Sequence, residues 1–307
     1  MKTTTIKGTT ISCMSLGTAQ LGYHYGISNK TGKPDRKVAH EILNHALQCG
    51  VNCFDTAAAY GDAEDVIGEW LSTLSPVKQP LVVTKVAHLE HSSLSALRED
   101  MQKQVALAKR KLGVRQLPML MLHHFDEYLE DADNMDIVFQ ELKQNGDICL
   151  SGVSAYSQHD YKEIAETDFD AVQIPLNIFD NTHVENGELN KLYEAGKIIF
   201  VRSVYLQGLV FQDPDHLKPE MEFCQDALVK FRSLCKRWNL SPATLSIAYV
   251  LSLPGITSLV LGSETVEQLE ENLKLIKDAP TLTAKQIEEI HKTFYNIETR
   301  VINPSQW

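Results

Sequence analysis

The chain has 307 residues, 43% of them hydrophobic and 22% charged, and its formal net charge is −11. This composition is ordinary for a soluble globular protein with a large core. No run of Lys and Arg forms a basic stripe, so we expect neither nucleic acid nor an anionic membrane surface as a partner. The N-terminal residues lack the continuous apolar segment of a secretion signal, and no segment reaches the roughly 18 apolar residues of a membrane span.

The cysteine pattern agrees with a cytoplasmic protein, the location that we expect. The six cysteines are scattered and contain no CxxC pair: Cys13, Cys49, Cys53, Cys149, Cys224 and Cys235. In such a chain they are most simply buried reduced thiols, so we expect neither disulfides nor a metal site.

A short β-hairpin is predicted over residues 2–13, where Thr and Ile alternate around Lys7 and Gly8. Apolar runs and helical patterns then alternate. The runs predict strands near 14–17, 51–54, 81–86, 117–123, 148–153, 171–174, 198–204 and 257–261. The helical patterns lie near 36–49, 63–73, 93–112, 134–145, 158–166, 187–195, 223–238 and 265–277. This alternation indicates parallel strands joined by crossover helices. Eight repeats without a GxGxxG motif favour an α/β fold of the closed (β/α)8 TIM-barrel type over an open sheet.

Three further segments lie outside the eight repeats. Residues 205–222 form a long Pro-containing loop, which is typical of a functional or mobile segment. A helix is predicted over Pro242–Leu253, with Ser241 as its N-cap, and an additional C-terminal helix near 283–296 precedes the tail Thr299–Trp307. No linker or break in composition divides the chain, so we predict one domain over residues 1–307.

Four chemically reactive side chains follow three successive predicted strands: Asp55, Tyr60, Lys85 and His123. The carboxyl ends of parallel barrel strands are where such folds place their chemistry. A phenol has a pKa near 10 and becomes a better acid beside a positive charge. Lys85 can supply that charge, Asp55 can hold Lys85, and His123 can orient a substrate oxygen. The set predicts a proton donor beside a carbonyl, and a cofactor is then needed to supply hydride.

His123 and His124 are adjacent, which raises the possibility of a metal site. Neighbouring residues on a strand point to opposite sides. We therefore expect one ring to face the barrel end and the other to face the helices, without a shared metal ion.

Several motifs, taken together, make the chain resemble the aldo-keto reductase family over nearly its full length. They are LGTAQLG (16–22), GVNCFDTAAAYGDAEDVIG (50–68), TK (84–85), LMLHHFD (120–126), SGVSAYS (151–157), VQIPLNIFD (172–180), VRSVYLQG (201–208) and LVLGSETVEQLEENL (259–273). The resemblance implies an NAD(P)H-dependent carbonyl reductase on a barrel. It also implies that Tyr60 is the general acid, that Lys85 and Asp55 tune it, and that His123 orients the substrate.

The same resemblance implies a set of cofactor-binding positions. They are Ser154 and Gln173 for the nicotinamide carboxamide, Ser203 and the loop through Gly208 for the pyrophosphate, Gly262 and Ser263 for phosphate before a helix starting near Thr265, and Glu271 and Asn272 for adenine. Two positions depart from the family: Ala155 replaces the usual Asn, and Arg202 stands where many members stack Tyr or Trp on the nicotinamide. A planar guanidinium can also stack on an aromatic face.

The largest departure concerns the extra phosphate of NADP(H). NADP-selective members carry Lys or Arg where this chain has Gly262 and Gln268, and Glu264 adds a negative charge nearby. A phosphate is held less well without a cation. The family favours NADP(H), whereas these residues favour NAD(H), and we keep NADP(H) first with NAD(H) as the alternative.

The substrate is expected to be a small-molecule carbonyl compound. Candidate pocket residues are Tyr23, His24, Tyr25, His88, Phe125 and the terminal Trp307. Several polar rings would suit a sugar or polyol-type carbonyl. Two other functions remain open: a nicotinamide-binding regulatory or scaffold protein with little turnover, and a cofactor-free hydrolase or lyase using Asp55 and His123. No stretch marks a subunit interface, so no oligomeric state is predicted.

Overall fold

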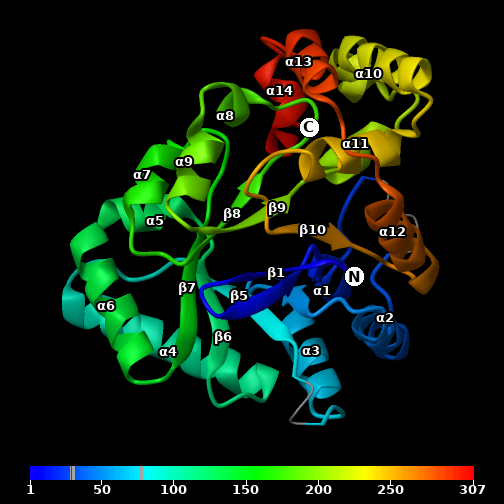
Figure 1. Ribbon diagram of the computed structural model, residues 1–307. Helices are drawn as coiled ribbons and strands as arrows, with labels where there is room; N and C mark the ends of the chain where they lie inside the picture. Colours follow the sequence, from blue (N-terminus) through cyan, green and yellow to red (C-terminus); the bar gives the residue numbers. More distant parts are fainter. Residues whose placement is uncertain (28, 30–31, 76–78) are drawn as a thin grey trace.

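The computed structural model describes residues 1–307 except 28, 30–31 and 76–78. Eight parallel strands close into a barrel in the order β10-β3-β4-β5-β6-β7-β8-β9 (Figure 1). The strands are β3 (Met14–Gly17), β4 (Cys53–Asp55), β5 (Leu81–Val86), β6 (Leu117–Leu122), β7 (Ile148–Ser154), β8 (Ala171–Pro175), β9 (Ile198–Arg202) and β10 (Ser258–Gly262). The predicted (β/α)8 barrel is confirmed, and the strand boundaries differ from the predicted ones by at most two residues.

The predicted N-terminal hairpin is also present and closes one end of the barrel. Strands β1 (Thr3–Ile6) and β2 (Thr9–Ser12) pair antiparallel, and the hairpin lies across the barrel in Figure 1. Ile11 packs with the side chains that fill the barrel interior, among them Met119, Met121 and Phe200, and Ile6 borders the same cluster. Because this end is plugged by apolar side chains, a ligand must approach from the carboxyl ends of the strands.

Helices surround the barrel and mostly match the sequence patterns. They are α1 (Ala19–Gly22), α2 (Arg36–Gln48), α3 (Ala63–Leu71), α4 (Leu94–Leu112), α5 (Phe125–Glu130), α6 (Ala132–Gln144), α7 (Tyr161–Glu166), α8 (Thr182–Glu185), α9 (Glu188–Glu194), α10 (Gln225–Trp238), α11 (Pro242–Leu251), α12 (Val266–Asp278), α13 (Ala284–Thr293) and α14 (Thr299–Ile302). Ser241 caps α11 as predicted, since its side chain accepts a hydrogen bond from the Thr244 amide.

Two predicted irregular segments are partly helical. Residues 205–222, predicted as a loop, contain most of two 3-10 helices, η2 (Leu206–Phe211) and η3 (Pro219–Cys224). The tail predicted after the last long helix contains α14 and η4 (Pro304–Gln306). Helices of three to six residues are too short to produce a periodic apolar pattern, so the sequence does not reveal them.

The expectation of buried cysteines is only partly right. None of the six forms a disulfide, and Cys53, Cys224 and Cys235 are buried. Cys49 and Cys149, however, are exposed. Cys49 is the C-cap residue of α2 and Cys149 is the second residue of β7, and both are in contact with solvent.

Side-chain alternation along the strands determines which residues reach the candidate site. The interior cluster includes Cys53, Val83, Met121, Ala171 and Phe200. Because side chains on a strand alternate between its two faces, the residue two positions later points the same way. That rule brings six predicted residues to the open end of the barrel: Asp55, Lys85, His123, Gln173, Arg202 and Gly262.

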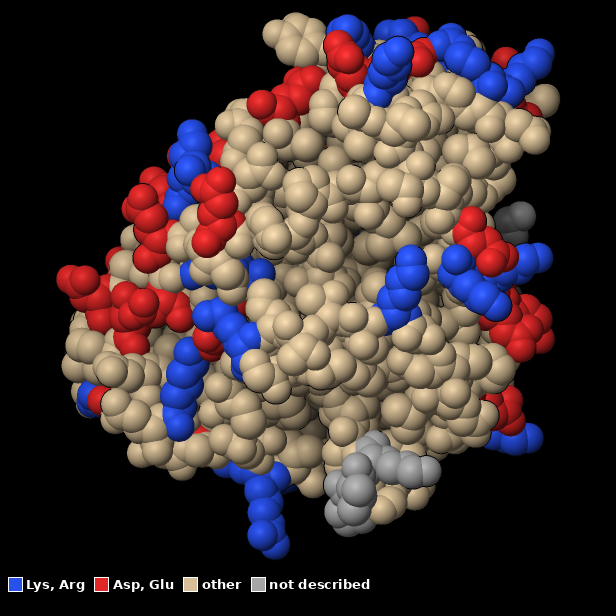
Figure 2. Space-filling view, viewed as in Figure 1, with Lys and Arg blue, Asp and Glu red and all other residues tan. Residues whose placement is uncertain are grey.

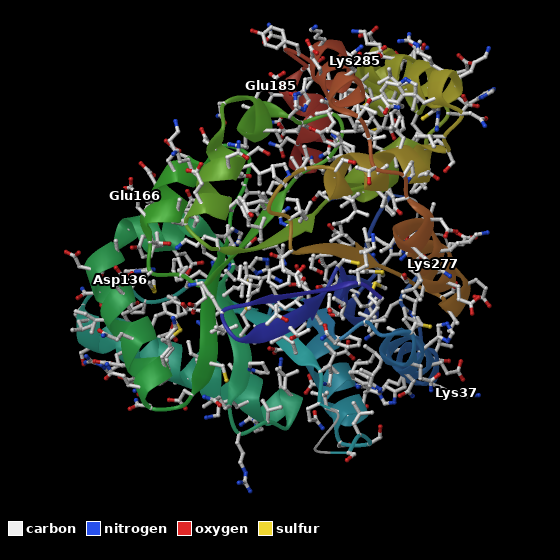
Figure 3. All side chains as sticks on the ribbon, in the orientation of Figure 1. Lys37, Asp136, Glu166, Glu185, Lys277 and Lys285 are labelled. Carbon is white, nitrogen blue, oxygen red and sulfur yellow. The ribbon has the colours of Figure 1, made fainter. Side chains whose placement is uncertain are left out.

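Charged side chains lie mainly around the outside of the molecule. On the face seen in Figure 2 the positive and negative side chains are interspersed along the periphery. Figure 3 shows Lys37, Glu166 and Lys277 on the outer helices α2, α7 and α12, pointing away from the barrel. None of the described helices combines the length and apolarity needed to cross a bilayer.

Candidate functional site at the open end of the barrel

A buried ion pair forms the base of the site. The Lys85 Nζ donates to Asp55 Oδ1 at 2.6 Å and to the backbone oxygen of Thr56 at 3.0 Å. Gln173 Nε2 donates to the same Asp55 oxygen at 2.7 Å. The Lys85 side chain has no exposed surface and that of Asp55 has 4%. Strands β4, β5 and β8 thus hold a carboxylate, an ammonium and an amide in one buried network.

Tyr60 and His123 lie above this ion pair. Lys85 Nζ is 5.3 Å from the centre of the Tyr60 ring. The rings of Tyr60 and His123 meet edge to face, with centroids 5.7 Å apart and an interplanar angle of 82°. The four side chains that the sequence singled out are therefore neighbours at the open end of the barrel.

The protonation of these groups follows from their environment. Burial, followed by the Asp55 carboxylate, raises the pKa of Tyr60 well above its usual value, while Arg202 lowers it. Lys85, from which a lowering was expected, is not among the main influences on the pKa of Tyr60. Burial, with Lys85 next, lowers the pKa of His123 to about 3. Near neutral pH the site thus presents a protonated phenol and an uncharged imidazole.

The backbone near Tyr60 is fixed by a close approach of two segments. A Cβ placed on Gly22 would lie 1.7 Å from the Tyr60 carbonyl oxygen, and one on Gly61 would lie 2.6 Å from the Gly22 oxygen. Only glycine fits at such a distance. The Tyr60 oxygen accepts from the Ala63 amide at the start of α3, which further fixes the residue.

His124 and Tyr156 extend the site in a way that the sequence did not predict. The His123 and His124 rings stack at 4.9 Å, and His124 stacks on Tyr156 at 5.7 Å. The expectation that one histidine faces the helices is therefore wrong. Strand β6 ends at Leu122, so strand alternation no longer applies to His124, which is the N-cap residue of α5. Within the described part of the chain, no group of His, Cys, Asp and Glu is arranged to hold a metal ion.

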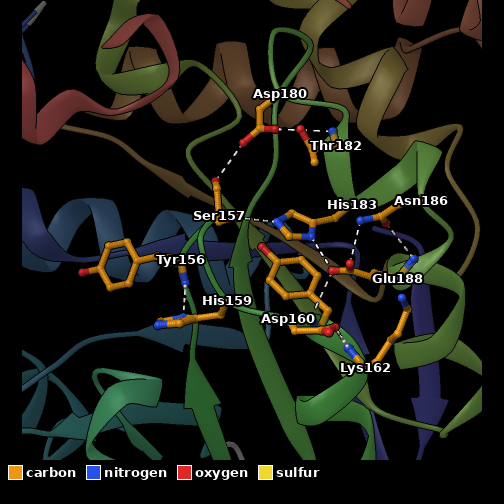
Figure 4. A network of polar contacts seen from close by, with 11 residues as sticks. Tyr156, Ser157, His159, Asp160, Lys162, Asp180, Thr182, His183, Asn186 and Glu188 are labelled. Carbon is orange, nitrogen blue, oxygen red and sulfur yellow. Dashed lines mark hydrogen bonds and ion pairs between the residues drawn. The ribbon is translucent and has the colours of Figure 1, made fainter. Parts of the chain in front are cut away.

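The loop that carries Tyr156 is held by its neighbours (Figure 4). The Tyr156 amide donates to Nδ1 of His159 at 3.0 Å, and Nε2 of His159 lies 3.1 Å from Asp126. Because Nδ1 accepts, the His159 proton is on Nε2. Next along the chain, Ser157 Oγ donates to Asp180 at 2.7 Å, which ties this loop to the loop after β8.

A buried histidine strengthens the same connection. His183 stacks on Tyr161 at 3.8 Å, with its Nδ1 2.6 Å from Glu188 and its Nε2 2.8 Å from the Ser157 carbonyl oxygen (Figure 4). This network makes a rigid support for the Tyr156 side of the site.

Two predicted nicotinamide-binding residues lie beside the ion pair. Ser154, the last residue of β7, is paired in register with Gln173 in β8, and both are buried. A hydroxyl next to an amide is a donor and acceptor set that suits a carboxamide. Arg202 at the end of β9 instead packs its guanidinium 4.7 Å from the centre of the Tyr156 ring.

The predicted pyrophosphate loop has an unusual backbone. Ser203, Leu206 and Gln207 all have positive φ angles, and Gly208 has a φ of 98°. Non-glycine residues rarely adopt this conformation, and such strain is typical of functional sites. The Gln207 oxygen accepts from the Ile27 amide at 3.2 Å, so this loop contacts the one after β3.

The predicted adenine end is organised around Asn272. Its Oδ1 accepts from the Tyr205 hydroxyl at 3.0 Å, and its Nδ2 donates to Ser263 Oγ at 3.3 Å. Tyr205 lies in the loop that was predicted to hold the pyrophosphate, but nothing in the sequence marks its contact with Asn272, 67 positions away. The neighbouring Glu271 is exposed on α12.

Gly262 accommodates the side chain of Gln20, a contact that the sequence did not reveal. A Cβ at this position would lie 2.2 to 2.5 Å from the side-chain amide of Gln20. Gln268, predicted near the extra phosphate of NADP(H), accepts from the Glu264 amide at 2.8 Å. At the two positions where NADP-selective members carry Lys or Arg, this chain thus has Gly262, packed against the Gln20 amide, and the uncharged Gln268.

The predicted substrate-pocket residues divide into two groups. Tyr23 meets Tyr60 edge to face at 6.3 Å and Tyr25 at 5.8 Å, and His88 lies 6.2 Å from His124. The other three have different surroundings. The His24 ring contacts the backbone oxygen of Asn29, and the Trp307 indole donates to the backbone oxygen of Arg300. The Phe125 side chain is only 1% exposed and packs against Tyr128 and His159. Phe125, the first residue of α5, therefore packs into the core and is not accessible to a substrate.

Comparisons with known proteins agree with the fold and the motifs. The family model described as "Aldo/keto reductase family" matches residues 13–293. The NADH-specific methylglyoxal reductase of Escherichia coli is 25% identical over 301 residues, covering 86% of this chain and 89% of that protein. The D-arabinose 1-dehydrogenase of Saccharomyces cerevisiae is 24% identical, with 87% and 84% covered.

A solved structure extends the similarity to the whole chain. The aldo-keto reductase AKR11C1 from Bacillus halodurans in its holo form superposes with a TM-score of 0.77, at 20% identity, covering 99% of this chain and 100% of that one. This likeness concerns the fold, and the family model adds the sequence motifs. The chain therefore belongs to the aldo/keto reductase family of oxidoreductases.

Proposed function

We propose that this protein reduces an aldehyde or ketone to an alcohol with a nicotinamide cofactor. The observation that carries the proposal is the cluster of Tyr60, His123 and the Asp55–Lys85 pair at the open end of the barrel. When bound, the nicotinamide supplies hydride. The residues of the chain then position the carbonyl and deliver the proton.

Each residue has a role that matches its environment. Tyr60 carries its proton near neutral pH and donates it to the carbonyl oxygen as negative charge develops there. His123 is uncharged, so it orients that oxygen by a hydrogen bond without competing as an acid. Lys85, fixed by Asp55, supplies positive potential beneath the Tyr60 ring.

The residues around the predicted cofactor site support a dinucleotide. Ser154 and Gln173 offer a donor and acceptor set for a carboxamide, and Ser263 precedes the N-terminus of α12, where phosphate is favoured. We propose that NADH serves at least as well as NADPH, because Gly262 and Gln268 provide no cation. The E. coli relative, named as NADH-specific, agrees with this proposal.

The test uses Tyr60→Phe. This variant keeps the ring but loses the proton, so we expect NADH binding by fluorescence quenching to stay within about two-fold while turnover of simple aldehydes falls about 10²- to 10⁴-fold. Turnover that survives the substitution would refute the role of Tyr60. Nicotinamide binding without oxidation across a broad carbonyl panel would favour a regulatory or scaffold function instead.

A further inference from the structure

Arg202, at the end of β9, places a second buried or half-buried cation at the open end of the barrel, beside Lys85. Its Nη2 donates to the Ala155 carbonyl oxygen at 2.9 Å, and its Nη1 lies 3.4 Å from Ser203 Oγ. Among the residues that the structure describes, no Asp or Glu forms an ion pair with it. The other buried cation of the site, Lys85, is already paired with Asp55.

The charge of Arg202 reaches the reacting groups. It lowers the pKa of Tyr60, of Tyr25 and of His123, so its field extends to the residues that would surround the carbonyl. Its side chain is half-buried. A half-buried cation without a counter-ion is costly, and an anion brought by a ligand would offset that cost.

The guanidinium is also held in a fixed position. It packs on the Tyr156 ring, whose loop is tied down by His159 and by the Ser157–Asp180 bond. Arginine has five N–H donors in a rigid fork, and the two bonds above leave donors available. This arrangement suits the paired oxygens of a carboxylate or phosphate.

We propose that Arg202 binds an anionic group, a carboxylate or a phosphate, on the carbonyl substrate. This rests on the proposed function, because the anion and the reducible carbonyl belong to one molecule. Polar rings at Tyr23, Tyr25 and His88 would contact the part of the substrate between its two ends. Arg202 is then a residue that determines specificity, and it need not stack on the nicotinamide.

The experiment compares matched pairs of substrates. One pair is para-formylbenzoate and its neutral amide, and the other is glycolaldehyde phosphate and glycolaldehyde, so the two pairs distinguish carboxylate from phosphate. For each pair the ratio of kcat/KM values is measured in the wild-type protein and in Arg202→Gln. We expect the anionic member of at least one pair to be favoured about 10- to 100-fold and Arg202→Gln to bring that ratio close to one.

The ratio separates substrate recognition from cofactor binding, since a defect in cofactor binding lowers kcat/KM equally for both members of a pair. Arg202→Lys keeps the charge without the fork and should retain part of the preference. Arg232→Gln is a matched control: Arg232 is also half-buried, donates to the Gln212 oxygen at 2.8 Å and lies 5.8 Å from the Phe231 ring, but on α10. It should leave the ratio unchanged.

Two results would overturn the inference: ratios near one in the wild-type protein for both pairs, or a preference that persists in Arg202→Gln. If no carbonyl is turned over, the proposed function fails, and ligand-induced thermal stabilisation decides the inference separately. Para-formylbenzoate should then stabilise the wild-type protein more than its amide, and Arg202→Gln should remove that difference. An equal effect of the two compounds would refute anion binding.

Discussion

The Asp55–Lys85 pair can be tested by Asp55→Asn, which changes charge without changing size. The wild-type ammonium has no exposed surface and contacts Asp55 Oδ1 at 2.6 Å and the Thr56 oxygen at 3.0 Å. The substitution leaves a buried ammonium without its counter-ion. Breaking a buried pair in this way costs about 3–5 kcal/mol. We therefore expect the free energy of unfolding to fall by about that amount at neutral pH.

The loss should depend on pH in a defined direction. Burial already lowers the pKa of Lys85, and Asp55 is the leading group that raises it. Without Asp55 the folded-state pKa falls further below the unfolded one, so the unfolded chain binds more protons between the two values. The loss in the free energy of unfolding is then complete below the folded-state pKa of Lys85. It shrinks as pH rises above that value, by up to about 1.4 kcal/mol per pH unit.

The assay is urea denaturation of Asp55→Asn between pH 6 and pH 9, with Asp55→Asn/Lys85→Met as the companion variant. Removing both partners should recover most of the stability but not the turnover, because no unpaired charge remains buried. A loss below about 1 kcal/mol, a deficit that does not change with pH, or a double variant as unstable as the single one would refute the reasoning.

Three further predictions concern the neighbouring groups. Because the pKa of His123 is about 3, kcat/KM should show no histidine titration between pH 5 and 8 in a pH–rate profile, and a clear inflection there would contradict an uncharged ring. Gly22→Ala should lower the free energy of unfolding by about 1–3 kcal/mol in thermal unfolding, and it should also lower turnover because it displaces Tyr60. The control is Gly68→Ala, whose Cβ would lie 1.8 Å from a backbone oxygen of α4, and it should affect stability alone. Gln268→Arg should strengthen NADPH binding relative to NADH about ten-fold by fluorescence titration, and an unchanged ratio would place the extra phosphate elsewhere.

The sequence alone determined the class of fold and most of the reacting groups. Short apolar runs and intervening helical patterns depend on local residue order, so eight strands could be located without contacts. The alternation of side chains along a strand brings Asp55, Lys85 and His123 to one end of the barrel, since each follows an interior residue by two positions.

Only the tertiary structure decided the features that join distant segments or follow the end of a strand. Gln20 against Gly262 and Tyr205 against Asn272 are contacts between residues far apart in the chain, and no local pattern encodes them. His124 turns toward the site because β6 has ended before it. The protonation of Tyr60 depends on burial and on Asp55 together. Such effects come from the field of neighbouring segments once they pack, which residue order does not describe.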